Sequence, residues 1–506
     1  MLSKVLSATT IGLEAVLIKV EVDVASRGFP SLTIVGLPNK AIDESKERVR
    51  TAIYNSNYEM PGSRIVVNLA PADIPKEGSL FDLPIAVGIL TSAGIADGGY
   101  LKNSIMVGEL SLDGTIHPVP GVLLVAYLAA KKGIDNLFVP YGNASEAALI
   151  TGINVYPVKT LLDLILHLNN LKPIQKHKQI SLLEIEQELE YENDFGDIKG
   201  QENAKRALEI AASGFHNLHL KGPPGAGKTM MARAFPSILP QMREEEIIDV
   251  TKIYSVVNGG YGSALVTKRP FRCPHHTISR VGLVGGGNKL TPGEITFAHR
   301  GVLFLDEFPE FPRSTLEALR TPMEDGIVTI SRARGTMTFP ARFIFIAASN
   351  PCPCGFLGHP KKSCHCSLLQ ISNYKKRISG PILDRIDIHV DVPPVDQEKL
   401  TSVTSAEKSA MIRHRVEDAR LRQSRRLADS KVKTNGEMTV ANIKKYCRLS
   451  SEATEILKFA ITRFGLSARA YFKIIKVAQT IADISRRDII EKIDISEAIQ
   501  FRSKEN

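Results

Sequence analysis

The sequence has no long hydrophobic run and few cysteines. Its most apolar stretch, residues 80–96, is interrupted by Asp82, so no segment reaches the length of a membrane span. The N-terminal residues, MLSKVLSATTIGLE, show neither a long apolar core nor a small-residue cleavage site, which argues against a secretory signal. Six cysteines among 506 residues do not make a disulfide framework. These absences predict a cytoplasmic protein without a membrane partner.

What the sequence does have is an excess of positive charge. It contains 64 Lys and Arg against 54 Asp and Glu, a net charge of +10. A basic balance is compatible with polyanionic partners such as nucleic acids, although many proteins carry such an excess for solubility alone. At 506 residues the chain is too long for one core, so two to four domains are expected.

Residues 1–168 have the periodicity of a compact α/β domain. Val20, Val22 and Val24 alternate with charged residues, which is the pattern of a half-buried strand. The following pattern predicts helices over 40–57, 83–90 and 119–132 and strands over 65–69, 105–110 and 137–140. Residues 169–193 are charged and predict a linker.

The central motif of the chain is GPPGAGKT, which satisfies the phosphate-loop pattern G-x-x-x-x-G-K-[ST]. A strand-like run precedes it and good helix formers follow it, as the motif requires. Glycines let backbone N–H groups approach a polyphosphate. Lys228 would reach the β and γ phosphates, and the Thr229 hydroxyl would hold Mg²⁺. The candidate residues for ATP are Gly222, Pro223, Pro224, Gly225, Ala226, Gly227, Lys228 and Thr229.

Two later strands end in residues suited to hydrolysis. The run VLFLDE at 302–307 predicts a buried parallel strand whose carboxyl end reaches a ligand. Asp306 would then join the Mg²⁺ shell, and Glu307 would polarise the attacking water. The strand over 342–349 leads to Asn350, which fits a residue that senses the γ phosphate or orients the water. The alternative for Asn350 is a simple strand-end turn before proline.

Several blocks carry a family resemblance. They are RPFRCPHHTIS at 269–279, VGGGNKLTPGEITFAHRGVLFLDE at 284–307, SNPCPCGF at 349–356, SGPILDRID at 379–387 and LSARAYFKIIKVAQTIAD at 466–483. Residues 194–485 resemble the magnesium-chelatase-like branch of AAA+ ATPases, and nearly the whole chain is similar to the ComM (YifB) family of bacterial proteins. The resemblance implies a parallel-sheet ATPase core at 194–395, with a Cys-rich insertion at 350–367, and a linker helix and helical lid at 396–506.

The same resemblance implies a function. Members of this branch form rings, so the expected assembly is a homohexamer that hydrolyses ATP to move DNA. The implied activity is a branch-migration helicase on recombination intermediates during natural transformation. The implied partners are single-stranded or branched DNA and recombination proteins.

Two N-terminal segments, 75–90 and 108–133, resemble the proteolytic domain of the Lon protease family. Leu80 stands where that family has its nucleophilic serine, and Val125 where it has its catalytic lysine. Leucine and valine can neither attack a carbonyl nor accept a proton. Ser79 and Lys76 lie nearby in sequence but would have to meet within hydrogen-bond reach to replace them. The expected fold class is therefore multidomain α/β, beginning with a Lon-like, S5-like domain that has lost its peptidase.

Two arginines complete the expected ATPase site. In ring ATPases an arginine at the position of Arg385 reaches the γ phosphate of the next subunit. Arg469 begins a long C-terminal helix and would point back at the nucleotide of its own subunit as a second sensor. Either arginine alone is also compatible with a solvated surface charge.

Candidate DNA contacts lie in two loops. Strands over 327–331 and 336–340 predict a hairpin with Arg332 and Arg334 at its tip, where related helicases line the central pore. Arginine pairs with any phosphate regardless of base. The glycine-rich loop 284–291, which carries Lys289, is a second candidate. A charged, solvent-exposed hairpin without DNA is the alternative.

The cysteines cluster rather than pair along the chain. Cys352 and Cys354 form one C-x-C pair, Cys364 and Cys366 form another, and nine residues lie between the pairs. Four thiolates at this spacing could close a tetrahedral site around structural Zn²⁺, and His359 or His365 could replace one of them. A reduced, metal-free loop is the alternative. Cys273, with the nearby His275 and His276, is interpreted as the structural edge of the insertion rather than as a metal site of its own.

The leading hypothesis is thus an ATP-driven DNA motor. The alternative class is a protein-remodelling or chelatase-type subunit acting on a protein partner, including a peptidase-linked unfoldase. Leu80 and Val125 argue against the unfoldase, and the lack of a metal-binding adhesion-type domain after the lid argues against the chelatase. An ATP-binding regulator that barely hydrolyses is disfavoured by Glu307 and Asn350.

Overall fold

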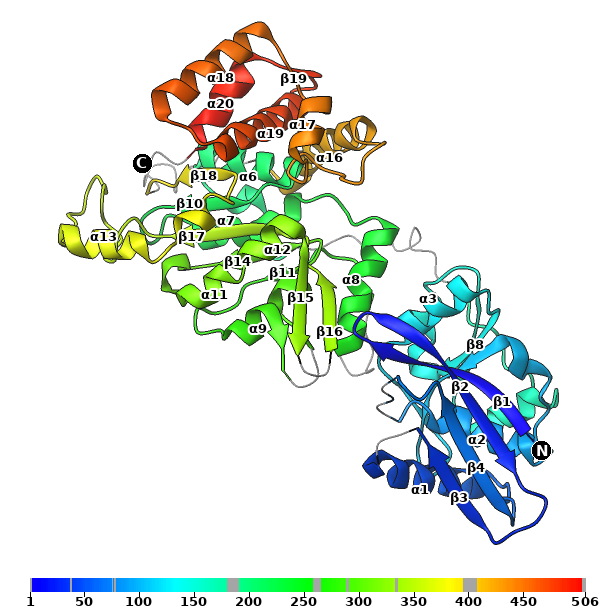
Figure 1. Cartoon of the computed structure of the whole chain (residues 1–506). Coiled ribbons are helices and arrows are strands. Elements are labelled where there is room, and N and C mark those ends of the chain that lie inside the picture. Colours follow the sequence, from blue (N-terminus) through cyan, green and yellow to red (C-terminus); the bar gives the residue numbers. More distant parts are fainter. Residues whose placement is uncertain are drawn as a thin grey trace. The chain divides into compact units, whose positions relative to one another are not determined.

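The computed structural model describes residues 2–36, 39–74, 76, 79–179, 191–257, 265–287, 291–332, 335–394 and 407–502. The chain forms two compact units, each described here by itself (Figure 1). The first comprises Met1–Gln187 with Arg243–Thr267, and the second comprises Glu188–Met242 with Lys268–Asn506. In the described part of the chain, no helix is long and apolar enough to cross a membrane.

The first unit is built on a mixed sheet of seven strands in the order β3-β4-β2-β1-β5-β8-β9. Its strands are β1 (Leu2–Ile11), β2 (Glu14–Val24), β3 (Ser31–Val35), β4 (Arg64–Ala70), β5 (Ser104–Met106), β8 (Asn136–Pro140) and β9 (Asn154–Val158). The alternation in β2 buries Val20 and Val22 completely, as the pattern predicts. The first strand, β1, was not predicted, although it lies in the middle of the sheet.

Helices pack against this sheet and complete the first core. They are α1 (Asn39–Asn55), α2 (Asp82–Ser92), α3 (Val122–Lys132), α4 (Ala144–Ala147) and α5 (Leu161–Leu168), with a small hairpin of β6 (Glu109–Leu110) and β7 (Ile116–His117). The predicted helices correspond to α1, α2 and α3. Strand β9 and helix α5 are further elements that the sequence patterns did not identify.

Helix α8 (Glu244–Val257) belongs to the first unit although it lies far along the sequence. Its Ile248 packs against the apolar cluster around α3, and the Lys252 ammonium lies 3.7 Å from the centroid of the Tyr127 ring. Cation–π and apolar contacts together hold the helix there. The central segment of the chain, which follows the phosphate-loop motif, therefore contributes one helix to the N-terminal unit.

The second unit contains a five-stranded parallel sheet, as expected. Its order is β11-β14-β17-β10-β18, formed by β10 (Leu218–Lys221), β11 (Phe271–Arg272), β14 (Val302–Leu305), β17 (Ile344–Ser349) and β18 (Ile388–Asp391). Every neighbouring pair is parallel. Strand β14 is buried along its whole length, which confirms the interpretation of its continuous apolar run.

Short helices and hairpins surround this sheet. The helices are α6 (Glu202–Gly214), α7 (Lys228–Ala234), α9 (Arg280–Val284), α10 (Glu294–Phe297), α11 (Arg313–Glu317), α12 (Arg320–Asp325), α13 (Leu368–Lys376) and α14 (Gly380–Leu383). One antiparallel hairpin joins β12 (Gly285–Gly286) to β13 (Thr291–Pro292). The other joins β15 (Ile327–Arg332) to β16 (Gly335–Pro340), which confirms the predicted hairpin.

The C-terminal region is helical, as expected. It contains α16 (Ser409–Arg426), α17 (Val440–Tyr446), α18 (Ser451–Phe464), α19 (Ala468–Ile484) and α20 (Lys492–Gln500), with β19 (Arg448–Leu449) paired to β20 (Ile489–Ile490). Helix α19 begins after Ser467, whose hydroxyl accepts from the N–H of Ala470 as a helix cap. Val477 and Ile481 of this helix are buried.

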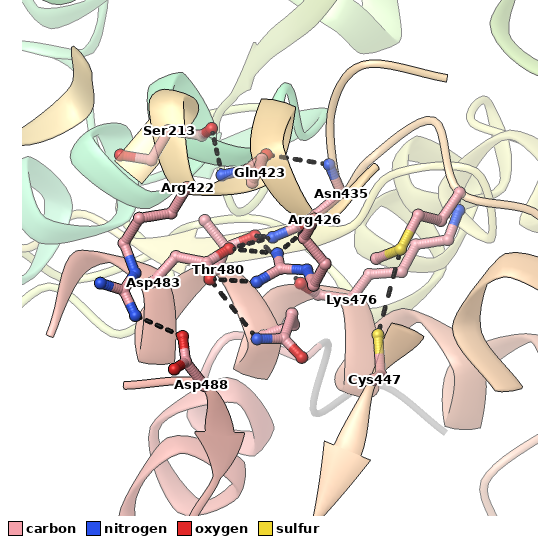
Figure 2. A network of polar contacts seen from close by, with 12 residues as sticks. Ser213, Arg422, Gln423, Arg426, Asn435, Cys447, Lys476, Thr480, Asp483 and Asp488 are labelled. Atoms are coloured by element: carbon pink, nitrogen blue, oxygen red, sulfur yellow. Dashed lines mark hydrogen bonds and ion pairs between the residues drawn. The ribbon is translucent and has the colours of Figure 1, made fainter. Parts of the chain in front are cut away.

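A buried polar network ties this lid to the ATPase core (Figure 2). Arg426 of α16 donates to both carboxylate oxygens of Asp483 of α19, each at 2.6 Å. The Asn435 amide also donates to Asp483, at 2.8 Å. Gln423 links the network to α6 by donating to the carbonyl oxygen of Ser213 at 3.0 Å. Since α6 leads into β10, the lid is anchored to the element that precedes the phosphate loop.

Candidate functional site

The phosphate loop begins at the carboxyl edge of the parallel sheet, between β10 and α7. The Gly222 N–H donates to the carbonyl oxygen of Ser349 at the end of β17, at 3.1 Å. A Cβ on Gly222 would lie 2.2 Å from the carbonyl oxygen of Val392, so only glycine fits between the strands. Gly225 and Gly227 have φ angles of +76° and +87°, which other residues rarely adopt. The loop conformation thus explains three of the motif's residues.

Lys228 is buried over this loop, with 8% of its surface exposed. Its ammonium donates to the carbonyl oxygens of Gly222 at 2.7 Å and Pro223 at 2.9 Å. A third bond, of 3.2 Å, reaches the side-chain oxygen of Asn350. Burial lowers the pKa of Lys228, and the nearby Asp306 carboxylate opposes that shift. The structure therefore brings the motif lysine and the strand-end asparagine together.

Thr229 and Asp306 form a second contact at the same edge of the sheet. The Thr229 hydroxyl donates to Asp306 at 2.6 Å, and the other Asp306 oxygen accepts from the N–H of Glu307 at 2.9 Å. A hydroxyl and a carboxylate are oxygen ligands of the kind that Mg²⁺ prefers. These two residues could hold the ion together with a nucleotide phosphate.

Glu307 stands beside this pair with an exposed carboxylate. Its side chain is 61% exposed, and its backbone is left-handed, with φ of +49°. A non-glycine residue in this region is strained, and such residues concentrate at functional sites. The carboxylate lies 3.7 Å from Nδ1 of His276. His276 follows β11, the neighbour of β14, and sequence reasoning treated it only as a structural edge. A histidine shortly after a second strand end was the signal that could have identified it.

Arg385 and Arg469 meet at a different place, on the carboxylate of Glu324. Arg385 lies 2.8 Å and Arg469 3.6 Å from its two oxygens. The Arg385 side chain is 10% exposed, and its Nε has no hydrogen-bond partner in the described part of the chain. Both arginines line a cavity of about 530 Å³ between core and lid, and residues 222–229 are not among its lining residues. The same-subunit role of Arg469 therefore stays a prediction.

The candidate DNA residues are only partly described. Arg332 is the last residue of β15 and is in register with Gly335 of β16. Arg334 and Lys289 lie outside the described residues. The β15–β16 hairpin is present, and β12 pairs with β13 on either side of the segment that contains Lys289. The contacts of these three side chains with DNA stay predictions.

The four clustered cysteines come together as the spacing predicts. Their sulfur atoms all lie within 4.8 Å of one another, and Cys352 lies 3.4 Å from Cys354 and 3.6 Å from Cys364. A tetrahedron with Zn–S bonds of about 2.3 Å has S–S edges of about 3.8 Å, so the cluster fits zinc. The N–H groups of Phe356 and His365 lower the pKa of Cys354 to about 6, whereas hydrogen bonding with the neighbouring thiols raises the pKa of Cys364 and of Cys366.

One of the alternative zinc ligands has other partners. His359 Nδ1 accepts from the backbone N–H groups of Lys361 and Lys362, at 3.0 Å each. Its ring also packs edge-on against Phe356. The geometry therefore favours a site of four sulfur atoms over a mixed site that uses Nδ1 of His359.

In the first unit, the positions that correspond to the Lon catalytic pair are apolar and packed. Leu80 and Val125 contact the same apolar cluster. Ser79 donates instead to the Glu109 carboxylate. Lys76 is 2% exposed, and its ammonium donates to the carbonyl oxygen of Ile74 at 3.0 Å. Burial lowers the pKa of Lys76, but Ser79 and Lys76 have separate partners, so the structure does not join them as a nucleophile and its base.

Comparison with protein families gives three matches that together span most of the chain. Residues 194–400 match magnesium chelatase, subunit ChlI; residues 20–143 match subunit ChlI of Mg-chelatase; and residues 406–502 match the ChlI C-terminal region. All three agree with the resemblance in the sequence blocks.

Individual relatives match either nearly the whole chain or a part of it. The competence protein ComM of Haemophilus influenzae is 42% identical, over 99% of this chain and 97% of that protein. YifB of Escherichia coli is 41% identical over the same shares. Lon protease 2 of Bacillus subtilis is 30% identical over 173 residues, which are 32% of this chain and 31% of that protease.

Proposed function

Because the chain belongs to the ComM/YifB family of magnesium-chelatase-like ATPases, we propose that it is an ATP-driven DNA motor. Its proposed activity is that of a homohexameric branch-migration helicase on recombination intermediates. The observation that carries the ATPase part is the meeting of Lys228, Thr229, Asp306 and Asn350 at one edge of a parallel sheet. The DNA part is supported by a relative named as a competence protein and by the net charge of +10.

Each residue of the site would have a separate role in hydrolysis. Lys228 would exchange its loop carbonyls for the β and γ phosphates, and Thr229 and Asp306 would hold Mg²⁺, which neutralises phosphate charge when bound. The exposed Glu307 carboxylate would accept a proton from the attacking water. Asn350, already within 3.2 Å of Lys228, would orient that water or sense the γ phosphate.

The arginine pair supports a site that is completed by a neighbouring subunit. Arg385 is nearly buried, its guanidinium lies 2.8 Å from Glu324, and its Nε has no acceptor among the described residues. Glu324 would hold Arg385 and Arg469 in place until the ring forms. We propose that Arg385 then reaches the γ phosphate of the next subunit, where an arginine stabilises charge in the transition state.

For DNA, we propose that the tip of the β15–β16 hairpin tracks the backbone inside the ring. Arg332 and Arg334 would pair with phosphates of single-stranded or branched DNA, and Lys289 would add a further contact. Such contacts are independent of sequence and weaken with salt. For the cysteines, we propose a structural Zn²⁺ bound by Cys352, Cys354, Cys364 and Cys366.

The ATPase proposal is tested by Lys228→Ala. Loss of the buried ammonium should abolish hydrolysis or nucleotide-dependent assembly, whereas Lys131→Ala, which removes an exposed lysine at the end of α3, should change neither. Steady-state ATPase and sedimentation with and without ATP measure both properties. Unchanged hydrolysis in Lys228→Ala would overturn the site assignment.

The DNA proposal is tested by replacing Arg332 and Arg334 together with alanine. DNA stimulation of the ATPase should fall while basal turnover remains, and the double variant Lys131→Ala/Lys132→Ala controls for the loss of two charges. The assay compares single-stranded, duplex and branched DNA and adds strand displacement on the branched substrate. Equal loss of basal and stimulated activity would instead indicate a role in folding. A wild-type ATPase that no DNA stimulates would favour a protein-remodelling motor.

A further inference from the structure

The cysteine loop, residues 350–367, lies directly against the phosphate loop. A Cβ on Gly355 would be 2.4 Å from Cδ and 2.6 Å from Cγ of Pro224. Both distances are below 3.0 Å, which real Cβ atoms essentially never show. Gly355 also has a φ of +82°, and its N–H donates to the carbonyl oxygen of Cys352 at 3.0 Å. Only glycine at this position lets the two loops touch.

A second link joins the cysteine cluster to the catalytic groups. Asn350, which accepts from the Lys228 ammonium, precedes Cys352 by only two residues. Cys352 is fully buried, and its sulfur accepts from the N–H of Leu357 at 3.3 Å. The segment that carries the sulfur ligands therefore also sets the position of Asn350.

The two loops also share a cavity of about 820 Å³. Gly222 and Pro223 line it from the phosphate loop, and Pro351 and Leu357 line it from the cysteine loop. A change in the cysteine loop would therefore change the surroundings of the phosphate loop as well as its direct contact with Gly355.

We propose that the metal-bound cysteine loop is a positioning element of the nucleotide site, so that metal occupancy sets the affinity for ATP. This inference rests on the proposed ATP and zinc sites. With the metal in place, Gly355 holds Pro224 and the backbone holds Asn350 beside Lys228 before ATP arrives. Without it, the four thiols lose their common partner, and nucleotide binding must also order the loop. Because ordering the loop costs free energy, it weakens binding. A loop that is already ordered does not incur that cost, which is why preorganisation raises affinity.

The experiment compares two alanine substitutions in the same loop. Gly358 has nearly the same left-handed backbone as Gly355, with φ of +78°, but among the described residues no heavy atom beyond its chain neighbours lies within 4 Å of a Cβ placed there. Gly355→Ala and Gly358→Ala therefore impose a similar backbone strain, and only Gly355→Ala presses on the phosphate loop. The measurements on the full chain are zinc content, thermal unfolding, and the Kd of a fluorescent ATP analogue with Mg²⁺.

We expect Gly355→Ala to keep its zinc and to bind the ATP analogue at least tenfold more weakly, while Gly358→Ala stays within about twofold of wild type. Removing zinc from the wild-type chain with a chelator should weaken binding similarly, and added zinc should restore it. If Gly355→Ala unfolds, Gly355→Ala/Pro224→Ala, which removes the obstructing ring, should recover folding and part of the affinity.

Three results would overturn the inference. One is unchanged nucleotide affinity in wild-type protein stripped of zinc, and another is an equal effect of Gly355→Ala and Gly358→Ala. A purified chain without zinc would overturn both the proposed metal site and the link between metal and affinity, and the two alanine variants would then test only the contact between the loops. If wild type bound no ATP, the failure would lie in the proposed function.

Discussion

Breaking the buried ion pair between Arg426 and Asp483 should be one of the most destabilising single changes in the lid. The two side chains are 16% and 0% exposed, and both Asp483 oxygens accept from the arginine at 2.6 Å. Arg426→Ala would leave the carboxylate buried, with the Asn435 amide as its remaining close donor. Removing one partner of a buried pair costs about 3–5 kcal/mol. We expect a loss of that size in the unfolding free energy of the lid.

Arg486→Ala is the matched control for this prediction. Arg486 lies 2.8 Å from Asp418 in the same lid, but these side chains are 72% and 35% exposed. An exposed pair contributes less than about 1 kcal/mol. Hydrogen exchange of the α19 amides measures both effects locally, which avoids assuming two-state unfolding of a multidomain chain.

Two outcomes decide the interpretation. Adding Asp483→Asn to Arg426→Ala removes the unpaired charge and should restore much of the lost stability. If Arg426→Ala lowered the unfolding free energy of the lid no more than Arg486→Ala does, burial would not make the loss of this ion pair more costly. That result would refute the reasoning.

Further predictions concern pH, magnesium and the arginine pair. Burial, with Arg300 and Arg342 nearby, lowers the pKa of His299 to about 3. Between about pH 6.5 and pH 3, His299 is therefore protonated in the unfolded state but not in the folded state. The free energy of unfolding should then fall by up to about 1.4 kcal/mol for each pH unit of acidification. His299→Asn, which can still accept from the Arg342 N–H, should flatten Tm against pH from 6 to 4; an unchanged slope would contradict this. Thr229→Val removes the hydroxyl that donates to Asp306 and should lower Mg²⁺-dependent hydrolysis about a hundredfold or more, with a smaller effect on nucleotide binding; an unchanged kcat would exclude the assigned role. Glu324→Gln should raise the subunit concentration needed for half-maximal ATPase without changing nucleotide affinity of the isolated chain, and a shift in that affinity would count against a role between subunits.

Local patterns in the sequence predicted the elements that are defined by local physics. The phosphate loop follows from its glycines, and β14 follows from an uninterrupted apolar run. The cysteine cluster followed from spacing, because its ligands lie within one short segment. In these cases the residues that determine a structure are neighbours in the chain.

The features that sequence reasoning missed depend on distant contacts. Strand β1 is rich in small polar residues and is recognisable only from its ten-residue register with β2. The meeting of Arg385 and Arg469 depends on Glu324 at the end of a different helix. Likewise, His276 approaches Glu307 because β11 lies beside β14, which no local pattern indicates.

The assignment of Arg243–Thr267 to the first unit has a consequence for how the protein can be divided. The chain passes between the two units three times, after Gln187, Met242 and Thr267. A protease that cuts only near residue 187 would release residues 1–187 covalently, and that fragment would stay attached only through its non-covalent contacts with residues 243–267. A chain shortened to begin at residue 188 would retain α8 without its partners around α3, which would expose the apolar contact surface of Ile248 and favour aggregation. The N-terminal unit therefore cannot be cut away or grafted as a cassette unless residues 243–267 go with it.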